Sequence, residues 1–116
     1  MFDEAGNEVT GAVEGDVYIV KVTGDIDVDN AARLREALAA AARAGLPRTV
    51  VDLSGLVFAD STVLHVLLDA QREHRSAGRR LVVAGPFGRT VGRLFDVTGT
   101  LGFFVIAPTV EAAVTS

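Results

Sequence analysis

The stretch from Thr49 to Ala70 constrains the fold most strongly, because its apolar pattern changes from strand-like to helix-like. Residues 49–53 form an apolar run of strand length. A short link, Ser54-Gly55, and a second apolar patch, Leu56 to Phe58, lead to a polar segment, and helical spacing begins there. A strand followed by a helix forms the first two parts of a strand–helix–strand unit. The sequence therefore predicts a sheet with helices packed against it.

The same alternation extends over the whole chain. Strands are predicted at 8–13, 16–23, 48–53, 80–84 and 103–106, and helices at 31–44, 60–77, 87–98 and 108–114. The second strand is apolar on most of both faces, which is typical of a central strand. Two strands followed by regular helix–strand alternation predict a mixed, mostly parallel sheet of four to five strands, with about four helices mainly on one side. With 116 residues, the chain is expected to form a single α/β domain over 1–116, with a loose start at 1–7.

Composition excludes several classes of function. The net charge of −4 argues against non-specific nucleic-acid binding, which needs a surplus of Lys and Arg. The chain has no cysteine, which excludes disulfides and thiolate chemistry and fits the cytoplasm. Its acidic N-terminus lacks the pattern of a signal peptide, and no apolar run is long enough to span a bilayer. We therefore expect a cytoplasmic protein without nucleic-acid binding or membrane insertion.

Catalytic motifs are not recognisable in the sequence. The two histidines, His65 and His74, have no metal-binding spacing; we place His65 beside the apolar stripe of its helix and His74 on the basic outer part. Ser61 lacks the GxSxG context of a hydrolase nucleophile. We expect no enzymatic activity, no metal and no cofactor.

Polar side chains follow two of the predicted strands. Gly24 and Gly55 each come after one of these strands and before the next helix. The carboxyl ends of neighbouring parallel strands form the usual functional edge of an α/β sheet. The residues expected there are Asp25, Asp27, Asp60, Ser61 and Thr62. The segment from Asp25 to Asp29 could hold a metal or an acid–base pair, but an N-cap role for Asp29 or Asn30 is the simpler interpretation.

Asp60-Ser61-Thr62 is a helix N-cap by its chemistry, since short side-chain oxygens accept the unpaired N–H groups of a first turn. The same N–H groups and the helix dipole tolerate an added phosphate. Two interpretations stay open: a plain structural cap, or a hydroxyl that an external kinase modifies with its own base and magnesium.

Arginines supply most of the positive charge and lie in two parts of the sequence. They are Arg72, Arg75, Arg79, Arg80, Arg89 and Arg93. The simpler interpretation is a solvated helix face, and the alternative is a docking surface for an acidic partner.

Four segments resemble the STAS domain of bacterial anti-sigma factor antagonists. They are Gly24–Asp27, Val50–Leu56, Phe58–Leu64 and Arg93–Gly99. The resemblance implies binding to an anti-sigma factor that is also a GHKL-type serine kinase, with release of a sigma factor. It also implies phosphorylation of Ser61, beside the second hydroxyl Thr62, and restoration by a serine phosphatase. Asp27 matches the acidic residue that the family carries before its first helix.

Val63 departs from the family pattern, which commonly has glycine after the two hydroxyls. A β-branched residue stiffens the first turn, and two consequences stay open: it narrows the approach of a kinase to Ser61, or it narrows the range of partners. The expected partner-binding set is Asp25, Asp27, Asp60, Ser61, Thr62 and Val63. The alternative function is a STAS subunit of a transport or sensory assembly, such as a lipid-transport ABC system, that docks on an ATPase without phosphorylation. For either function we expect a monomer or a weak dimer.

Overall fold

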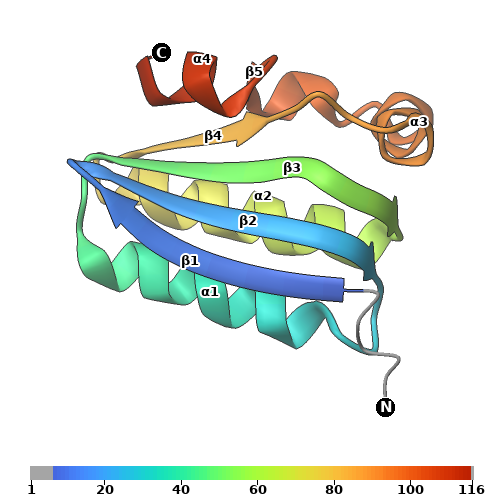
Figure 1. Cartoon of the computed structure of the whole chain (residues 1–116), viewed down its shortest axis with the longest axis horizontal. Coiled ribbons are helices and arrows are strands. Elements are labelled where there is room, and N and C mark those ends of the chain that lie inside the picture. The colour runs from blue at the N-terminus through green and yellow to red at the C-terminus, as the bar shows by residue number, and fades with distance from the viewer. Residues whose placement is uncertain (1–6, 116) are drawn as a thin grey trace.

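The computed structural model describes residues 7–115, which form one five-stranded sheet with the strand order β1-β2-β3-β4-β5 (Figure 1). The strands are β1 (Asn7–Glu14), β2 (Val17–Ile26), β3 (Arg48–Ala59), β4 (Arg80–Ala84) and β5 (Val105–Ala107). The helices are α1 (Ala31–Ala44), α2 (Ser61–Ser76), α3 (Arg89–Thr98), the 3₁₀ turn η2 (Leu101–Phe103) and α4 (Val110–Thr115). β1 pairs antiparallel with β2, and all other pairs are parallel. The predicted fold class is confirmed.

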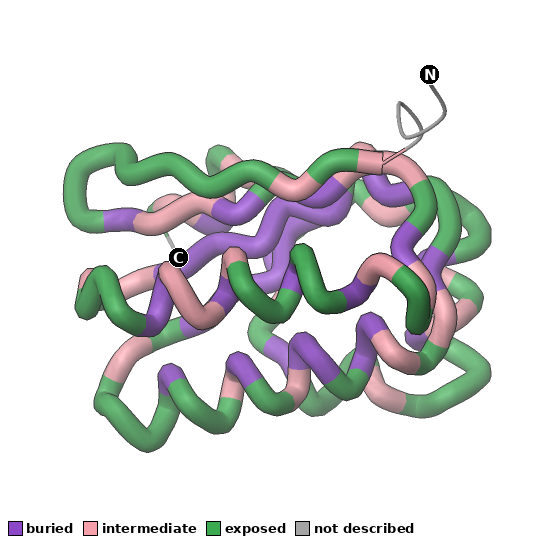
Figure 2. Tube along the Cα trace, turned by 90° about the horizontal axis from the view of Figure 1, so that it is seen from below, coloured by how far each residue is buried: buried purple, intermediate pink, exposed green. Residues whose placement is uncertain are grey.

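The sheet separates two apolar clusters. The larger cluster joins one face of β2, β3 and β4 to α1, α2 and α3, and its members include Val22, Leu53, Leu67 and Phe95. The smaller cluster lies on the opposite face, under α4, and contains Val17, Val50, Val82 and Ala113. Figure 1 shows α1 and α2 side by side below the sheet and α4 above it. In Figure 2 the central strands are largely buried, whereas β1 is exposed along most of its length.

β2 and β3 are longer than their sequence pattern predicts. We expected β3 to end at Leu53 and an acidic loop to begin at Gly24, but the two strands stay paired until Ile26 lies beside Ala59. The pairing continues through Gly55 because glycine has no Cβ atom. A Cβ atom at this position would lie 2.7 Å from Cγ2 of Thr23, which is too close. Glycine therefore lets the two backbones approach, where local sequence resembled a turn.

Both ends of α1 and the C-terminal end of α3 at Thr98 agree with the sequence prediction, and the other helix ends differ. α1 spans the predicted residues and ends at Gly45, whose φ of 70° suits glycine. α2 begins one residue after the predicted start, with Asp60 as its N-cap. α3 begins at Arg89 instead of residue 87, and η2 delays β5 to Val105. Pro108 precedes α4, and the Thr109 hydroxyl accepts a hydrogen bond from Ala112 N–H at 3.1 Å.

His74 is buried, at 1% exposure, so its predicted place on the outer part of α2 is wrong. Its Nε2 atom lies 2.9 Å from Oγ1 of Thr49 on β3, and its Nδ1 atom lies 2.8 Å from the carbonyl oxygen of Ala70. Residue 74 follows the buried residues Leu67 and Ala70 by seven and four positions, which places all three on one face of α2. His65 is exposed.

The expected loose start at 1–7 falls outside the described residues except for Asn7. That residue already belongs to β1, and its side-chain oxygen accepts a hydrogen bond from Arg33 at 2.8 Å. Within the described chain, no helix is long and apolar enough to cross a membrane.

Candidate functional site

Asp60 links two segments at the carboxyl edge of the sheet. Its Oδ1 atom accepts a hydrogen bond from Thr62 N–H at 2.9 Å, which caps α2. Its Oδ2 atom accepts a hydrogen bond from Val28 N–H at 3.2 Å, across 32 positions of sequence. One carboxylate therefore fixes the start of α2 and the segment between β2 and α1.

Asn30 holds the segment between β2 and α1 from within. Its side-chain oxygen accepts a hydrogen bond from Asp27 N–H at 2.8 Å, and its amide nitrogen donates to the carbonyl oxygen of Asp25 at 3.0 Å. Asp27 Oδ1 in turn accepts from Asp29 N–H at 3.0 Å. Asn30 is thus the N-cap residue of α1 by position, but its side chain stabilises the preceding turn instead of the helix N–H groups.

The two hydroxyls of the motif have different surroundings. Ser61 is the first residue of α2 and is exposed, and within residues 7–115 its hydroxyl makes no hydrogen bond. Thr62 is half-buried. Ser61 is therefore the more accessible of the two hydroxyls.

Val63 is only 2% exposed and belongs to the larger core cluster. The third residue of the helix turns its side chain towards the sheet, so the methyl groups pack inward. The side chain therefore does not crowd Ser61 from outside, and it adds no surface for a partner. This finding differs from the expectation that Val63 narrows the approach to the serine.

The acidic side chains lie at the same edge of the sheet. Asp25 is exposed near the end of β2, and Asp27 and Asp60 are half-buried in the two linked segments. Asp29 is also exposed. Among the described residues, no group of three or more His, Asp or Glu side chains could hold a metal ion. The acids instead accept backbone hydrogen bonds or face solvent.

Three exposed apolar side chains at this edge were missed by the sequence reasoning. Val28 is 68% exposed, Val57 is 65% exposed and Phe58 is 45% exposed. Val57 and Phe58 lie near the end of β3 between the buried residues Leu56 and Ala59, and Phe58 is the register partner of Asp25. Contiguous apolar patches rimmed by polar residues mark interaction sites when they are large, whereas single exposed apolar side chains are ordinary.

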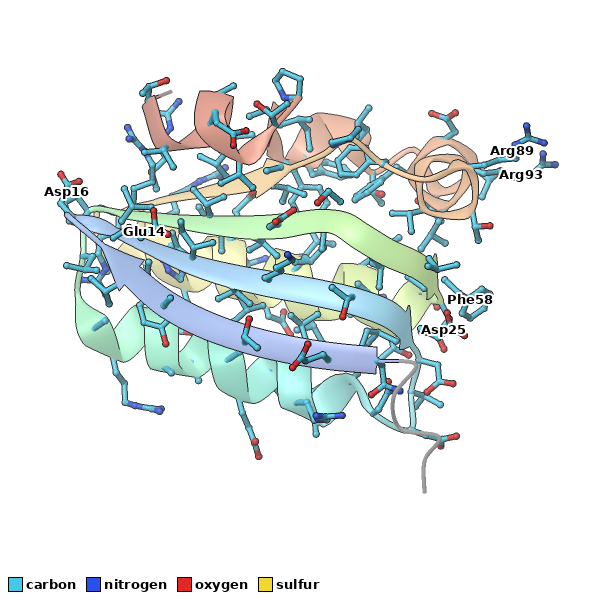
Figure 3. The ribbon with its side chains drawn as sticks, viewed as in Figure 1. Glu14, Asp16, Asp25, Phe58, Arg89 and Arg93 are labelled. Atoms are coloured by element: carbon cyan, nitrogen blue, oxygen red, sulfur yellow. The ribbon has the colours of Figure 1, made fainter. Side chains whose placement is uncertain are left out.

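The arginines that the sequence analysis listed together lie at opposite ends of the molecule. Arg79 and Arg80 lie at the beginning of β4, whereas Arg89 and Arg93 lie on α3, which follows the end of β4. Figure 3 shows Arg89 and Arg93 projecting from the same end of the molecule as Phe58 and Asp25. The carboxyl edge therefore has an acidic part and a basic part.

Ser61 has no base in hydrogen-bond contact among residues 7–115. His65 lies one helical turn after Ser61, a spacing that the sequence reasoning did not use, and no hydrogen bond joins the two within the described part of the chain. An exposed serine without a bound base is a weak nucleophile. The site presents an exposed hydroxyl among acidic and apolar side chains at one edge of the sheet.

Comparison with known proteins identifies the family of the chain. A family model described as "Mlab, STAS domain" matches residues 10–105. The chain belongs to the STAS domain family. A relative from Staphylococcus epidermidis named anti-sigma-B factor antagonist is 33% identical over 84 residues, which cover 72% of this chain and 77% of the relative.

Two solved structures extend the comparison of the STAS fold. An anti-sigma factor antagonist from Mycobacterium paratuberculosis matches with a TM-score of 0.86 and 25% identity, over 99% of this chain and 97% of the other. The Bacillus cell fate determinant SpoIIAA, in its phosphorylated form, matches with a TM-score of 0.67 and 19% identity, over 94% and 96% of the two chains. The second likeness is one of fold alone.

Proposed function

We propose that this STAS protein is an anti-sigma factor antagonist that is switched by phosphorylation of Ser61. In its unmodified form it binds an anti-sigma factor of the GHKL serine-kinase type, and the sigma factor is released. Transfer of the γ-phosphoryl group of ATP to Ser61 ends this binding, and a serine phosphatase restores it. The observation that carries the proposal is the exposed Ser61 hydroxyl at the start of α2, next to the Asp60 cap, in a chain whose relatives are named antagonists.

The surroundings of Ser61 explain how a phosphate would act. A phosphoserine carries about −1.5 to −2 charges at neutral pH. Asp60 already takes the N–H of Thr62 through its side chain and that of Val63 through its carbonyl oxygen, at 2.9 and 3.1 Å. These two hydrogen bonds leave fewer N–H groups of the first turn for the phosphate, so part of the added charge stays on an acidic edge. We expect a steric and electrostatic block of association without a change of fold.

The test is incubation with a GHKL-type anti-sigma factor of the same genome and ATP, followed by peptide mass mapping. A single phosphate on Ser61, absent from Ser61→Ala and retained in Thr62→Ala, supports the proposal. Association is measured on the same samples by isothermal titration calorimetry. Unmodified protein should bind and modified protein should not; equal affinity of the two forms contradicts the switch.

Several properties follow from this proposal. The protein acts in the cytoplasm, where the kinase, the phosphatase and ATP meet. It is not an enzyme, because the partner supplies the catalytic base and the metal. Asp25, Asp27 and Thr62 contact the partner around Ser61, and no cofactor or nucleic acid takes part.

A second candidate function is a STAS subunit of a transport assembly, such as a lipid-transport ABC system. The family model favours it by naming Mlab beside the STAS domain. In that case the same edge docks on an ATPase and Ser61 serves as an unmodified contact. Stable association with the assembly's ATPase, together with no phosphate on Ser61 after incubation with GHKL kinases, would favour this function.

A further inference from the structure

The carboxyl edge of the sheet carries its charges in a fixed spatial order. Asp25 lies at the end of β2, and its register partner Phe58 lies on the neighbouring β3. The start of α3 lies against β3, since a Cβ atom on Gly88 would be 3.7 Å from the backbone oxygen of Leu56. The sequence of side chains across the edge is therefore acidic, apolar and basic, and Figure 3 shows it as Asp25, Phe58 and the pair Arg89 and Arg93.

None of these charges is neutralised within the molecule. Arg89, Arg93 and Asp25 are exposed, and none of them forms an ion pair with another residue in the range 7–115. Asp96, on the last turn of α3, lines the same hollow as Arg89 and Arg93 and reduces the positive charge of this part without removing it. Between the two charged parts, Val57 and Phe58 expose apolar surface to water. Association of such a surface with one of opposite charge order lowers the free energy.

A second copy of this chain has that opposite order. Rotation by 180° about an axis through Phe58 converts acidic–apolar–basic into basic–apolar–acidic, so the edge is complementary to itself. We propose that two copies associate through this edge in an isologous dimer. In it, Arg89 and Arg93 of each copy face the acidic segment from Asp25 to Asp29 of the other, and the two Phe58 side chains meet at the axis.

The dimer would be weak and sensitive to salt. The contact involves two strand ends and one helix, which is small compared with a stable interface, and its charged parts are open to screening. It would also cover Ser61, which follows Phe58 by three residues. If the proposed function holds, self-association and kinase binding compete for one surface. The dimer itself does not depend on that function, because it needs no other protein.

Sedimentation velocity of the purified protein tests the proposal. We expect a concentration-dependent dimer between about 5 and 500 µM protein at about 50 mM salt, weakened at least about fivefold at 500 mM salt, where the Debye length is short. A wild-type protein that stays monomeric over this range at low salt would overturn the proposal. It would leave the phosphorylation of Ser61 untouched, since that is measured with the kinase.

Charge reversal identifies the surface. One variant carries Arg89→Glu and Arg93→Glu, and the other carries Asp25→Lys and Asp29→Lys, all at exposed positions. Asp27 is kept because it accepts a hydrogen bond from Asp29 N–H. Each variant alone should be monomeric, because like charges face each other. An equimolar mixture should form a heterodimer, because both charged contacts become attractive again.

The control variant Arg35→Glu/Arg75→Glu changes the net charge equally on exposed parts of α1 and α2. It should dimerise like the wild type. Circular dichroism confirms that each variant is folded. Arg89→Gln/Arg93→Gln replaces the arginine reversal if that variant is unfolded, and Asp25→Asn/Asp29→Asn replaces the aspartate reversal in the same way. Dimers that persist in the two reversal variants, or a mixture that stays monomeric, would show that another face or no specific face associates.

Discussion

The carboxylate of Asp60 accepts a hydrogen bond from the backbone N–H of Val28 at 3.2 Å, although 32 positions separate the two residues. The same carboxylate caps α2 at Thr62. The turn before α1 and the beginning of α2 therefore share one anchor. Ser61, which stands directly after that anchor, is positioned by both.

Asp60→Ala should lower the free energy of unfolding by about 1–2 kcal/mol, because it removes the cap of α2 and leaves Val28 N–H without its acceptor. Urea denaturation followed by circular dichroism measures this change. Asp29→Ala, at an exposed neighbouring carboxylate, should change stability by less than about 0.5 kcal/mol. Equal effects of the two substitutions would contradict the anchoring role of Asp60.

Ser61→Asp should weaken binding of the serine-kinase anti-sigma factor at least about tenfold, since it adds charge to an acidic edge. Because the side chain is exposed and unbonded within the described residues, the free energy of unfolding should stay within about 0.5 kcal/mol. Calorimetric titration and urea denaturation of the same preparation separate the two effects. Ser61→Ala provides the control and should bind like the wild type. Loss of binding accompanied by unfolding would argue against a charge-based switch.

His74→Ala should destabilise the protein by about 2–4 kcal/mol, because it opens a cavity between α2 and β3 and leaves the hydroxyl of Thr49 without its partner. The matched control is His65→Ala on the same helix, where the imidazole is exposed and the expected change is below about 0.5 kcal/mol. Thermal and urea denaturation should rank the two variants in this order. A similar cost for both would mean that the buried hydrogen bonds of His74 add nothing.

Gly55→Ala should cost about 1–3 kcal/mol of stability, because the new Cβ atom would meet the Cγ2 methyl group of Thr23. Thr23→Ser removes that methyl group, so the cost of Gly55→Ala should fall by about half in its presence. A double-mutant cycle by urea denaturation measures the coupling. Gly102→Ala, where nothing lies within 4 Å of the added Cβ atom, is the control. An additive cycle would show that the close approach of β2 and β3 is not limited by this pair.

Local sequence patterns predicted the fold class because apolar runs of strand length alternate with segments of helical apolar spacing. α1 was placed correctly at both ends, since Gly45 marks its end by backbone conformation alone. The extensions of β2 and β3 could not be predicted, because pairing between strands decides them. Ser54-Gly55 has the composition of a turn, but its role is set by Thr23, which lies far away in the sequence.

The candidate site was predicted in part. Gly24 and Gly55 placed the acids and hydroxyls on one edge of the sheet, because parallel strands bring their carboxyl ends together. The outward direction of Val57 and Phe58 was not predictable, since apolar residues in a strand ordinarily indicate burial. The burial of His74 could have been found by extending the helical spacing from Leu67 and Ala70.

The anchored turn also determines which of the two proteins changes conformation during binding. The hydrogen bonds of Asp60 and Asn30 keep the backbone around Ser61 in one arrangement before any partner arrives. A rigid surface loses little conformational entropy when it is bound. The partner should therefore be the protein that changes conformation on binding, and that change should slow the formation of the complex.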